Sequence, residues 1–584
     1  MDIFARGCAS ALLFVAIYVR ERGLFSMQED TLTKCLRKAR AARRLVVAAL
    51  LTTARHFETI SMKHLTFSRG VMLLSALTLA VQVDAQQTTA PEHLFFHVVL
   101  GAKIDHPISG RLLIFVQHGT GAKRVDVDQM SPNATYIAAK EIQGWKPGAT
   151  IDIDVDDLAF PEPLSHASTG DYEAQAVLDI GHTYNYAGRQ PGDLISDVVP
   201  LTAWNPGKDS GPTITLNGIQ SAPTAVAAIP KNKEAGFDTA IQLIDFVSPV
   251  LTTFWGRDIH MKCWVLLPPG YHAHKADHYP TVYFTHGFGG TLQSLHDRFA
   301  AMVYDHMLNK KMPEMIWVFL DESSPTGTHE FADSANNGPW GLALTTELIP
   351  HLETQYRMDA RSSGRFLQGH SSGGWATLWL QTNYPKIFGG TWSTSPDPSD
   401  FHAFSTIDLY APHPNFYHDP GGSPVPIMRD HGQVLATMEQ LAKQERVLGD
   451  YGGQLRSFEW VFSPRGTNGA PMPIFDRSTG EVDPLVASYW RNHYDIAHRV
   501  EENWSSLGPD LRGKINLVVG TADTFYLDGA AHKFEHVLDS LHAEPHFRYL
   551  TGKTHFDLYQ AGDDRYALID EIASEMYLVA RPKH

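Results

Sequence analysis

The sequence predicts an α/β fold with a mostly parallel sheet, preceded by an all-β, sandwich-like domain. Between residues 94 and 218, short apolar runs are broken by Gly, Pro, Asn and Asp, and no long helical period intervenes. After about residue 240, continuous apolar strands alternate with helix-length segments, which is typical of a sheet covered by helices on both faces. A chain of 584 residues, 43% of them apolar, is long enough to hold both parts.

An export signal is predicted near the start of the chain. It begins at Met62, with a basic stretch that includes Lys63, and continues with an apolar core over residues 71–81. Ala85 occupies a small-residue position before the cleavage site. Because the apolar core is shorter than the roughly 20 residues that span a bilayer, we expect a cleaved signal peptide over residues 62–85 and a secreted or periplasmic protein.

A signal peptide normally begins a chain, so the residues in front of it need an explanation. We interpret residues 1–61 as an extension that results from a wrongly assigned start. The alternative is a membrane anchor at residues 10–19, although that apolar stretch is shorter still. Once the signal is removed, Cys263 is the remaining cysteine, so the mature protein is expected to have no intramolecular disulfide.

Charge excludes one class of partner. The formal net charge is −16. Residues 1–85 hold 12 of the 48 Lys and Arg and 6 of the 64 Asp and Glu, which leaves 36 basic against 58 acidic residues in 86–584. Such an acidic body repels phosphate backbones and anionic lipid. We therefore expect no nucleic-acid partner. No stable membrane insertion is expected either, because the apolar stretches near the start of the chain are too short to span a bilayer.

The predicted β-domain covers residues 92–220, and a looser stretch over 221–240 is its expected linker. Its candidate strands are seven runs at the close spacing of an antiparallel sandwich. They are residues 94–100, 111–117, 135–142, 149–155, 173–180, 197–204 and 213–218.

Residues 241–584 form the predicted α/β domain. Its candidate strands end in turn or polar residues, and helical stretches separate several of them. The strands are predicted at residues 263–271, 281–287, 315–323, 364–370, 389–395, 515–523 and 546–550, with helices at 342–356, 374–384 and 529–542. In such sheets the chemistry gathers at the carboxyl ends of the strands.

A candidate nucleophile lies between the strand 364–370 and the helix 374–384. The pattern G-x-S-x-G places glycine two residues before and two after Ser371. A strand and a helix close tightly around such a serine, so any Cβ at those two positions would collide. Ser372 fails this test because His370 lies two residues before it. We therefore predict that Ser371 is the nucleophile and that the backbone N–H of Ser372 stabilises the oxyanion.

A second oxyanion donor is expected from the glycine-rich turn after strand 281–287, which reads HGFGG from His286. We choose the backbone N–H of Phe288, with Gly289 as the alternative. His286 itself is interpreted as structural.

The acid and the histidine should follow the serine in that order. The buried strand 515–523 leads into a loop that carries Asp523, our candidate acid, and Asp528, the alternative. One helix and one strand later, the next loop carries His555, the candidate base. Asp557 is interpreted as a loop or helix-start residue.

These roles describe acyl-ester chemistry. His555 would take the proton of Ser371 during attack on an ester carbonyl, and Asp523 would hold the imidazole in the right tautomer. The scheme needs no organic cofactor and no metal, and the histidines show neither HExxH nor paired-cysteine spacing.

The order of these motifs resembles a known family. GHSSGG, HGFGGT, GPWGLALTTELIPHLE, SPDPSDF and GTADTFYLDGAAHKFEHVL together look like the putative-esterase branch of the α/β-hydrolases, which includes esterase D, feruloyl esterases, enterochelin esterases and mycolyltransferases. The resemblance covers about residues 240–584. It implies an α/β-hydrolase fold and acyl-ester chemistry, with Ser371, Asp523 and His555 on the matching positions. A preceding all-β domain is similar to the layout of the enterochelin esterases.

One segment departs from the family pattern. Residues 401–514 are long and rich in aromatics, Pro and Gly, with helices predicted at 433–448 and 488–504. An insertion there is expected to lie over the active site as a partial cap. Trp340 and Trp375 are candidates for lining the pocket, with a place in the core as the alternative.

The sequence thus predicts a secreted or periplasmic serine carboxylesterase. We expect it to act on a small-molecule or glycan-linked ester, including esters linked to carbohydrate or siderophore. Two alternatives stay open at this point. The same residues could transfer the acyl group to an alcohol, or the protein could be an inactive relative that binds a glycan or a protein partner.

Overall fold

A computed structural model describes residues 93–128, 130–221 and 236–582, and these described residues form one compact unit. The predicted signal peptide, the extension before it and most of the predicted linker lie outside the described residues. In the described part of the chain, no helix is both long enough and apolar enough to cross a membrane.

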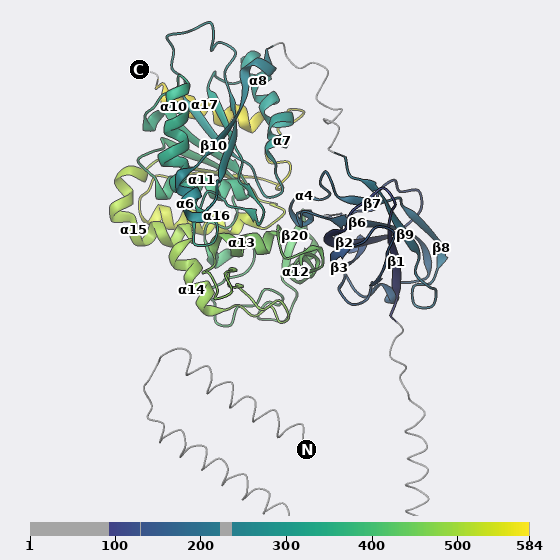
Figure 1. Cartoon of the computed structure of the whole chain (residues 1–584). Helices are drawn as coiled ribbons and strands as arrows, with labels where there is room; N and C mark the ends of the chain where they lie inside the picture. Colours follow the sequence, from purple (N-terminus) through teal and green to yellow (C-terminus); the bar gives the residue numbers. More distant parts are fainter. Residues whose placement is uncertain (1–92, 129, 222–235, 583–584) are drawn as a thin grey trace, which may run out of the picture. The chain divides into compact units, whose positions relative to one another are not determined.

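Nine strands between residues 95 and 219 form one sheet (Figure 1). They are β1 (Phe95–Leu100), β2 (Ile108–His118), β3 (Thr135–Trp145), β4 (Thr150–Asp154), β5 (Ala159–Phe160), β6 (Gly170–Asp179), β7 (Leu194–Ser196), β8 (Val199–Trp204) and β9 (Thr213–Ile219). The order is β4-β1-β9-β7-β6-β2-β3-β5, with β8 also on β6. Every pair is antiparallel except β1 with β9.

The two faces of this sheet are buried against different partners. Leu112 and Ile114 of β2 belong to a core made by residues 94–216 alone. Leu113 and Phe115, which point to the opposite face, belong to a smaller core completed by Val447 and Leu448, far along the chain. Alternate residues of β2 therefore have different roles. Those on one face stabilise the sheet itself, and those on the other face stabilise its attachment to the rest of the unit.

A second sheet of eight strands begins at residue 241. It contains β10 (Ile241–Val247), β11 (His260–Leu266), β12 (Thr281–Thr285), β13 (Ile316–Leu320), β18 (Arg365–His370), β19 (Gly390–Thr394), β22 (Ile515–Gly520) and β23 (His546–Leu550). The order is β10-β11-β13-β12-β18-β19-β22-β23. From β13 to β23 every pair is parallel, while β10 and β11 are antiparallel. The predicted mostly parallel sheet is thus confirmed.

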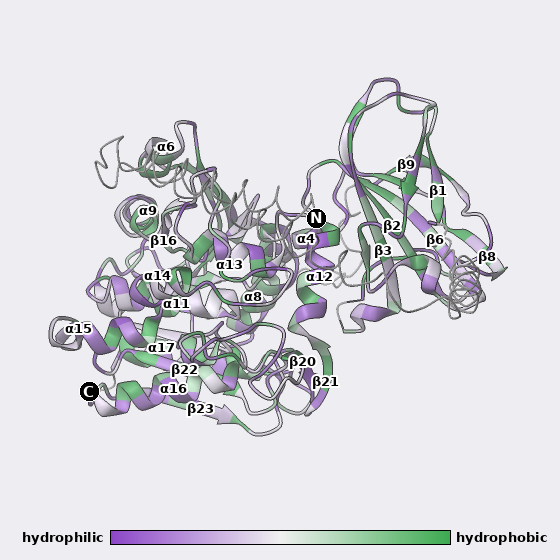
Figure 2. Ribbon diagram, turned by 90° about the horizontal axis from the view of Figure 1, so that it is seen from below, coloured by the Kyte–Doolittle hydropathy of each residue, from purple (hydrophilic) through white to green (hydrophobic). Residues whose placement is uncertain are grey.

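Helices pack on both faces of the second sheet. They are α5 (Phe237–Ala240), α6 (Pro249–Trp255), α7 (Leu292–Ser294), η3 (Leu295–Ala300), α8 (Ala301–Leu308), α9 (Trp340–Ala343), η4 (Leu344–Leu348), α10 (Ile349–Gln355), α11 (Ser372–Asn383), α16 (Leu527–Ser540) and α17 (Ala567–Ala580). Val282 and Phe284 of β12 face the core with α8 and α17. Tyr283, between them, faces the core with α10 and α11. Figure 2 shows α16 with both hydrophilic and hydrophobic residues around its turns, as expected of a helix with one buried face.

The segment from 401 to 514 contains β20 (Pro426–Asp430), β21 (Gln433–Thr437), α12 (Met438–Leu448), α13 (Gln454–Phe462), α14 (Pro484–His493) and α15 (Ile496–Leu511). Short strand pairs β14 (Ser323–Ser324) with β15 (Gly327–Thr328) and β16 (Asp333–Ser334) with β17 (Gly338–Pro339) precede it.

Two helix predictions in this segment were wrong in their bounds. The helix predicted over 433–448 begins only at Met438, because residues 433–437 pair with β20 and Thr437 forms a capping box with Gln440. The helix predicted over 488–504 is two helices, because Asp495 caps α15 and separates it from α14.

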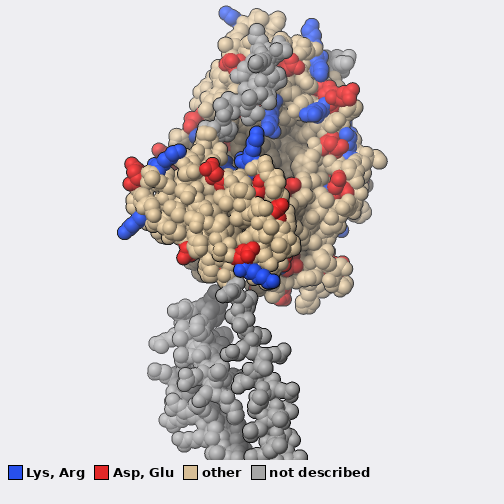
Figure 3. All heavy atoms as spheres, turned by 90° about the vertical axis from the view of Figure 1, so that its right-hand side faces the viewer, with Lys and Arg blue, Asp and Glu red and all other residues tan. Residues whose placement is uncertain are grey.

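Acidic and basic side chains are interspersed on the face shown in Figure 3.

Candidate active site

The backbone turns sharply at Ser371, between β18 and α11. Ser371 has φ 60° and ψ −126°, and its N–H donates to Thr394 O at 3.0 Å. The flanking glycines are needed here. A Cβ on Gly373 would lie 2.5 Å from His286 O, and one on Gly369 would overlap the Gly373 carbonyl. The turn therefore places the Ser371 side chain at the carboxyl end of a central strand.

The neighbouring serine has a different environment. Ser372 is buried, and its hydroxyl donates to Asp397 Oδ2 at 2.6 Å. Burial raises the pKa of Asp397 to about 6, although the Ser372 hydrogen bond lowers it. Ser372 is the first residue of α11, where backbone N–H groups lack helical acceptors. Its hydroxyl is therefore engaged by Asp397, while its N–H is one of those without a helical acceptor.

A histidine and a carboxylate form the second part of the site. His555 Nδ1 lies 3.0 Å from Asp523 Oδ2, and both residues are buried. Burial by itself would raise the pKa of Asp523, but the charge and hydrogen bond of His555 outweigh it, so the pKa lies below its usual value. The alternative acid, Asp528, instead accepts from Arg429 Nη2 at 2.8 Å. Asp523, and not Asp528, thus contacts His555.

Ser371 and His555 line one cavity of about 670 Å³. Their side chains are largely shielded from solvent, with residue exposures of 9% and 5%. Within the described part of the chain, no hydrogen bond joins Ser371 Oγ to the His555 ring. In ligand-free sites such bonds are often long and tighten when the substrate binds.

The glycine-rich turn lies on the same cavity and contributes Phe288 to its lining. Gly290 N donates to Gly287 O at 3.0 Å, which closes the turn. His286 supports it, since its Nδ1 lies 2.9 Å from Gly287 O and its Nε2 accepts from Glu322 N at 3.2 Å. Among the described residues, the N–H of Phe288 has no backbone or side-chain acceptor.

The remaining candidates have structural positions. Trp375, a residue of α11, is fully buried in the core, and Trp340 stacks on His329 with ring centroids 3.7 Å apart. Neither lines the cavity and both are buried, which agrees with the core position that the sequence left open as the alternative to a place in the pocket. Asp557 accepts from Thr554 N at 2.7 Å, as a loop residue does.

The predicted insertion contributes one wall of the cavity. Its contribution is largely apolar, with two amides and one carboxylate. The lining residues are Ile427, Met428, Ala436, Leu441, Gln444, Glu445, Leu448 and Gln454.

The profile described as "Putative esterase" matches residues 256–575, more than half of the chain. The chain belongs to the putative esterase family. It is therefore a carboxylic ester hydrolase, and its eight-stranded sheet is that of an α/β-hydrolase-like fold.

Solved structures were also compared with this esterase. A ferulic acid esterase shares 15% identity, with 58% of this chain and 98% of that chain covered and a TM-score of 0.36. An S-formylglutathione hydrolase from Agrobacterium tumefaciens shares 14%, with 58% and 94% covered and a TM-score of 0.33. The feruloyl esterase module from Clostridium thermocellum shares 12%, with 61% and 94% covered and a TM-score of 0.33. The comparison with curated proteins gave no match.

Several residues on the esterase's cavity were missed by the sequence reasoning. Asp126 and Tyr186 lie before the family region, and Glu445 lies in the insertion. No motif marks them. Asp397, under Ser372, follows the carboxyl end of β19, a position where polar side chains gather in such sheets, so this signal could have been used.

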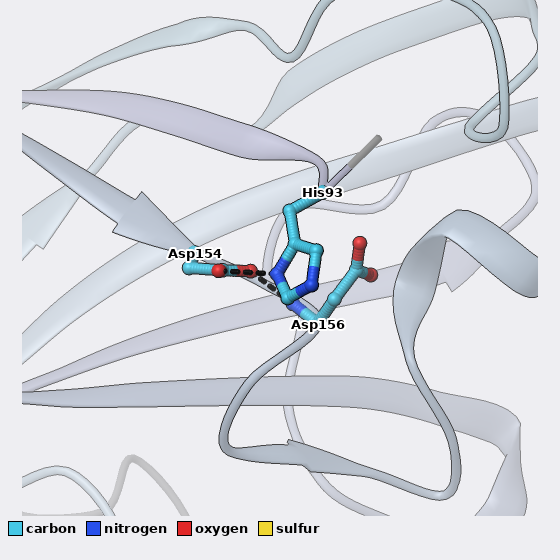
Figure 4. Close-up of side chains that lie close together, drawn as sticks. All are labelled: His93, Asp154 and Asp156. Atoms are coloured by element: carbon cyan, nitrogen blue, oxygen red, sulfur yellow. Dashed lines mark hydrogen bonds and ion pairs between the residues drawn. The ribbon is translucent and has the colours of Figure 1, made fainter. Parts of the chain in front are cut away.

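Among the residues that the structure describes, two groups of side chains have ligand atoms close enough for a metal ion, and neither lines the cavity. Figure 4 shows the first, in which His93 Nδ1 lies 2.6 Å from Asp154 Oδ2. In that group Asp156 accepts from Leu94 N and Ser165 N, which ties the start of β1 to the turn after β4. In the second, Asp400, His402 and Asp495, the two carboxylates accept from backbone N–H groups, Asp400 at the short helical turn Phe401–Ala403 and Asp495 at the start of α15. Backbone hydrogen bonds explain both groups.

Proposed function

We propose that this esterase hydrolyses small-molecule carboxylic esters through Ser371, His555 and Asp523, with an acyl-enzyme intermediate. The observation that carries the proposal is the His555–Asp523 pair at 3.0 Å, on the same cavity as a serine held with positive φ at a strand-to-helix turn. The backbone N–H groups of Phe288 and Ser372 are proposed to stabilise the oxyanion.

The proposed reaction consists of two half-reactions, acylation and then deacylation of Ser371. Ser371 Oγ bonds to the ester carbonyl carbon while its proton passes to His555 Nε2. His555 then gives that proton to the leaving alkoxide as the ester C–O bond breaks. Water repeats the sequence on the acyl-enzyme and releases the carboxylic acid and free Ser371. Asp523 keeps the imidazole Nδ1–H oriented and stabilises the ring when it is charged.

Two further parts belong to the proposal. We take residues 92–220 to be an all-β domain in front of the esterase domain, and the core formed by residues 94–216 alone supports this. Export by the signal peptide over residues 62–85 depends on the sequence pattern only.

The test uses p-nitrophenyl acetate and the matched pair Ser371→Ala and Ser372→Ala. Loss of the nucleophile can cost up to about 10⁶-fold in kcat, so S371A should lose at least about 10³-fold. S372A keeps its backbone N–H and should stay within about tenfold of the wild type. A fluorophosphonate probe should label S372A and not S371A. Comparable turnover by S371A and the wild type would overturn the assignment.

A further inference from the structure

The cavity of the esterase has a wall that comes from outside the family region. Residues before the match at 256 line it together with Ser371 and His555. They form two groups in segments that connect strands of the nine-stranded sheet, one between β2 and β3 and one between β6 and β7. The first consists of Asp126, Val127, Met130 and Pro132, and the second of residues 184–188.

The second group is a short turn, α4 (Tyr184–Ala187), that is held at both ends. On the side of its own sheet, Asp179 Oδ2 accepts from Tyr184 N at 3.0 Å, and the Tyr184 ring stacks on Phe115. On the other side, Asn185 Nδ2 donates to Glu445 O and Gly449 O at 3.0 and 2.6 Å. The backbone of α4 is therefore fixed against the end of α12.

Further contacts join the same two elements. Arg111 Nε of β2 donates to Val447 O at 2.9 Å, and Val447 and Leu448 complete the apolar core beneath Tyr184. The hydrogen bonds of Asn185 and Arg111 to the end of α12 and this apolar core thus act together, so α4 has a defined position relative to the cavity.

Tyr186 projects from this turn onto the glycine-rich loop. Its hydroxyl donates to Gly290 O at 2.8 Å, and its ring packs edge-to-face on Phe288 with centroids 5.0 Å apart. His286 contacts the Gly287 carbonyl of the same turn from another side. Gly287, at the start of the turn, is thus contacted by the ring of its neighbour His286, whereas Gly290, at its end, is held by Tyr186 from a distant part of the chain.

We propose that Tyr186 is a positioning residue for oxyanion stabilisation: it fixes the 287–290 turn so that the Phe288 N–H faces the developing negative charge. The inference rests on the proposed function. Oxyanion donors act because they are preorganised, and a misplacement of about 1 Å can cost about 10²-fold in rate. Glycines at 287, 289 and 290 leave the turn little stiffness of its own, so an external support matters.

The hydroxyl of Tyr186 suits this role. Burial raises its pKa well above the usual value, and the neighbouring carboxylates Glu322 and Asp321 raise it further. It therefore stays a neutral donor over the whole working pH range. Its partner is a carbonyl oxygen, which can accept a hydrogen bond from the protonated hydroxyl but not from a phenolate.

The experiment compares Tyr186→Phe with Tyr172→Phe in the full chain. Tyr172 is a matched control, because its hydroxyl also donates to a backbone carbonyl, Ser168 O at 2.6 Å, within the same sheet but off the cavity. Y186F should lower kcat on p-nitrophenyl acetate by about tenfold with KM within about twofold, since the lost interaction acts on the transition state. Y172F should keep wild-type kcat. Y186A, which also removes the ring on Phe288, should lose more.

A second readout separates positioning from general damage. Benzeneboronic acid forms a tetrahedral adduct with a serine nucleophile, and its affinity should fall in Y186F by the same factor as kcat/KM. Binding of the product acid should not change. Wild-type kcat and boronate affinity in Y186F would overturn the inference. So would an effect on KM alone, or an equal kcat loss in Y172F. An active S371A would overturn the proposed function instead, which keeps the two failures distinct.

Discussion

Beside the proposed base lies a second histidine that stays uncharged. The His370 and His555 rings have centroids 4.4 Å apart. Burial, together with the charge of His555, lowers the pKa of His370 to about 3. His370 is therefore neutral above that pH and does not repel a protonated His555. Two adjacent imidazoles can thus occupy the site while only one of them takes part in proton transfer.

A buried glutamate beneath the glycine-rich turn makes stability depend on pH. Glu322 is fully buried, its carboxylate oxygens have no hydrogen-bond partner among the described residues, and burial raises its pKa to about 8. In an unfolded chain a glutamate titrates near about 4.3. The folded state therefore binds this proton more tightly. The stabilisation is complete below the unfolded pKa and is lost as pH rises through about 8.

We predict that the free energy of unfolding falls by at least roughly 2 kcal/mol between pH 5 and pH 9, since each unit of pKa difference is worth about 1.4 kcal/mol. Glu322→Gln should make this slope shallower and raise the melting temperature at pH 9, while Glu330, Asp397 and Glu445, whose pKa values burial also raises, keep the rest of it. Urea unfolding at both pH values measures it. Glu544→Gln, at an exposed side chain, is the control and should keep the wild-type slope. An unchanged slope in E322Q would contradict the prediction.

Among the elements, the β18–α11 turn depends most on residue size. A Cβ on Gly369 would meet the Gly373 carbonyl and Thr285 Oγ1, both of which are fixed. We predict that Gly369→Ala lowers kcat/KM by at least about 10²-fold, because Ser371 would shift by a fraction of an ångström or more. Fluorophosphonate labelling and the melting temperature check it.

Gly529→Ala is the matched control for this turn. Gly529 lies in α16, where a Cβ would have its first neighbour 3.8 Å away. Alanine is the better helix former by roughly 0.5–1 kcal/mol, so G529A should be neutral or stabilising. Wild-type labelling and activity in G369A would show that the strand and helix can separate enough to accept a methyl group.

Local patterns explain how far the sequence could predict these elements. The turn at Ser371 requires glycines two residues before and two after the serine, so five residues of sequence were enough to predict it. The loops with Asp523 and His555 follow from the alternation of strands and helices. Asp528 remained an alternative because both aspartates follow β22 closely, and what separates them is Arg429, a residue from the insertion almost a hundred positions away. Tyr186 could not be predicted, because its contact with Gly290 depends on how α4 packs against α12.

On the scale of the whole molecule, the excess of acidic over basic residues extends to the lining of the cavity. No Lys or Arg lines the cavity within the described residues, whereas Asp126 and Glu445 do. Arg189 Nε lies 3.6 Å from Asp126 and offsets its charge. Glu445 accepts a backbone hydrogen bond from Leu455 N, and burial raises its pKa to about 7. At pH 8 and above, Glu445 therefore places a negative charge in the substrate cavity.

We predict from this that the esterase discriminates against anionic acyl groups, and more strongly at high pH. At pH 8.5 p-nitrophenyl hemisuccinate should have a kcat/KM at least about tenfold below that of p-nitrophenyl butyrate, which is similar in length and neutral. Two like charges about 4 Å apart near a protein surface repel by up to about 4 kcal/mol, so tenfold, or about 1.4 kcal/mol, is a modest expectation. Below pH 6 Glu445 is protonated while the hemisuccinate keeps its charge, and the ratio should shrink. Glu445→Gln should remove the pH dependence of the ratio. Glu439→Gln, on the same helix but off the cavity, should leave the pH dependence as it is in the wild type. Equal kcat/KM for the two esters at pH 8.5 would show that substrate acyl groups do not approach the α12 wall.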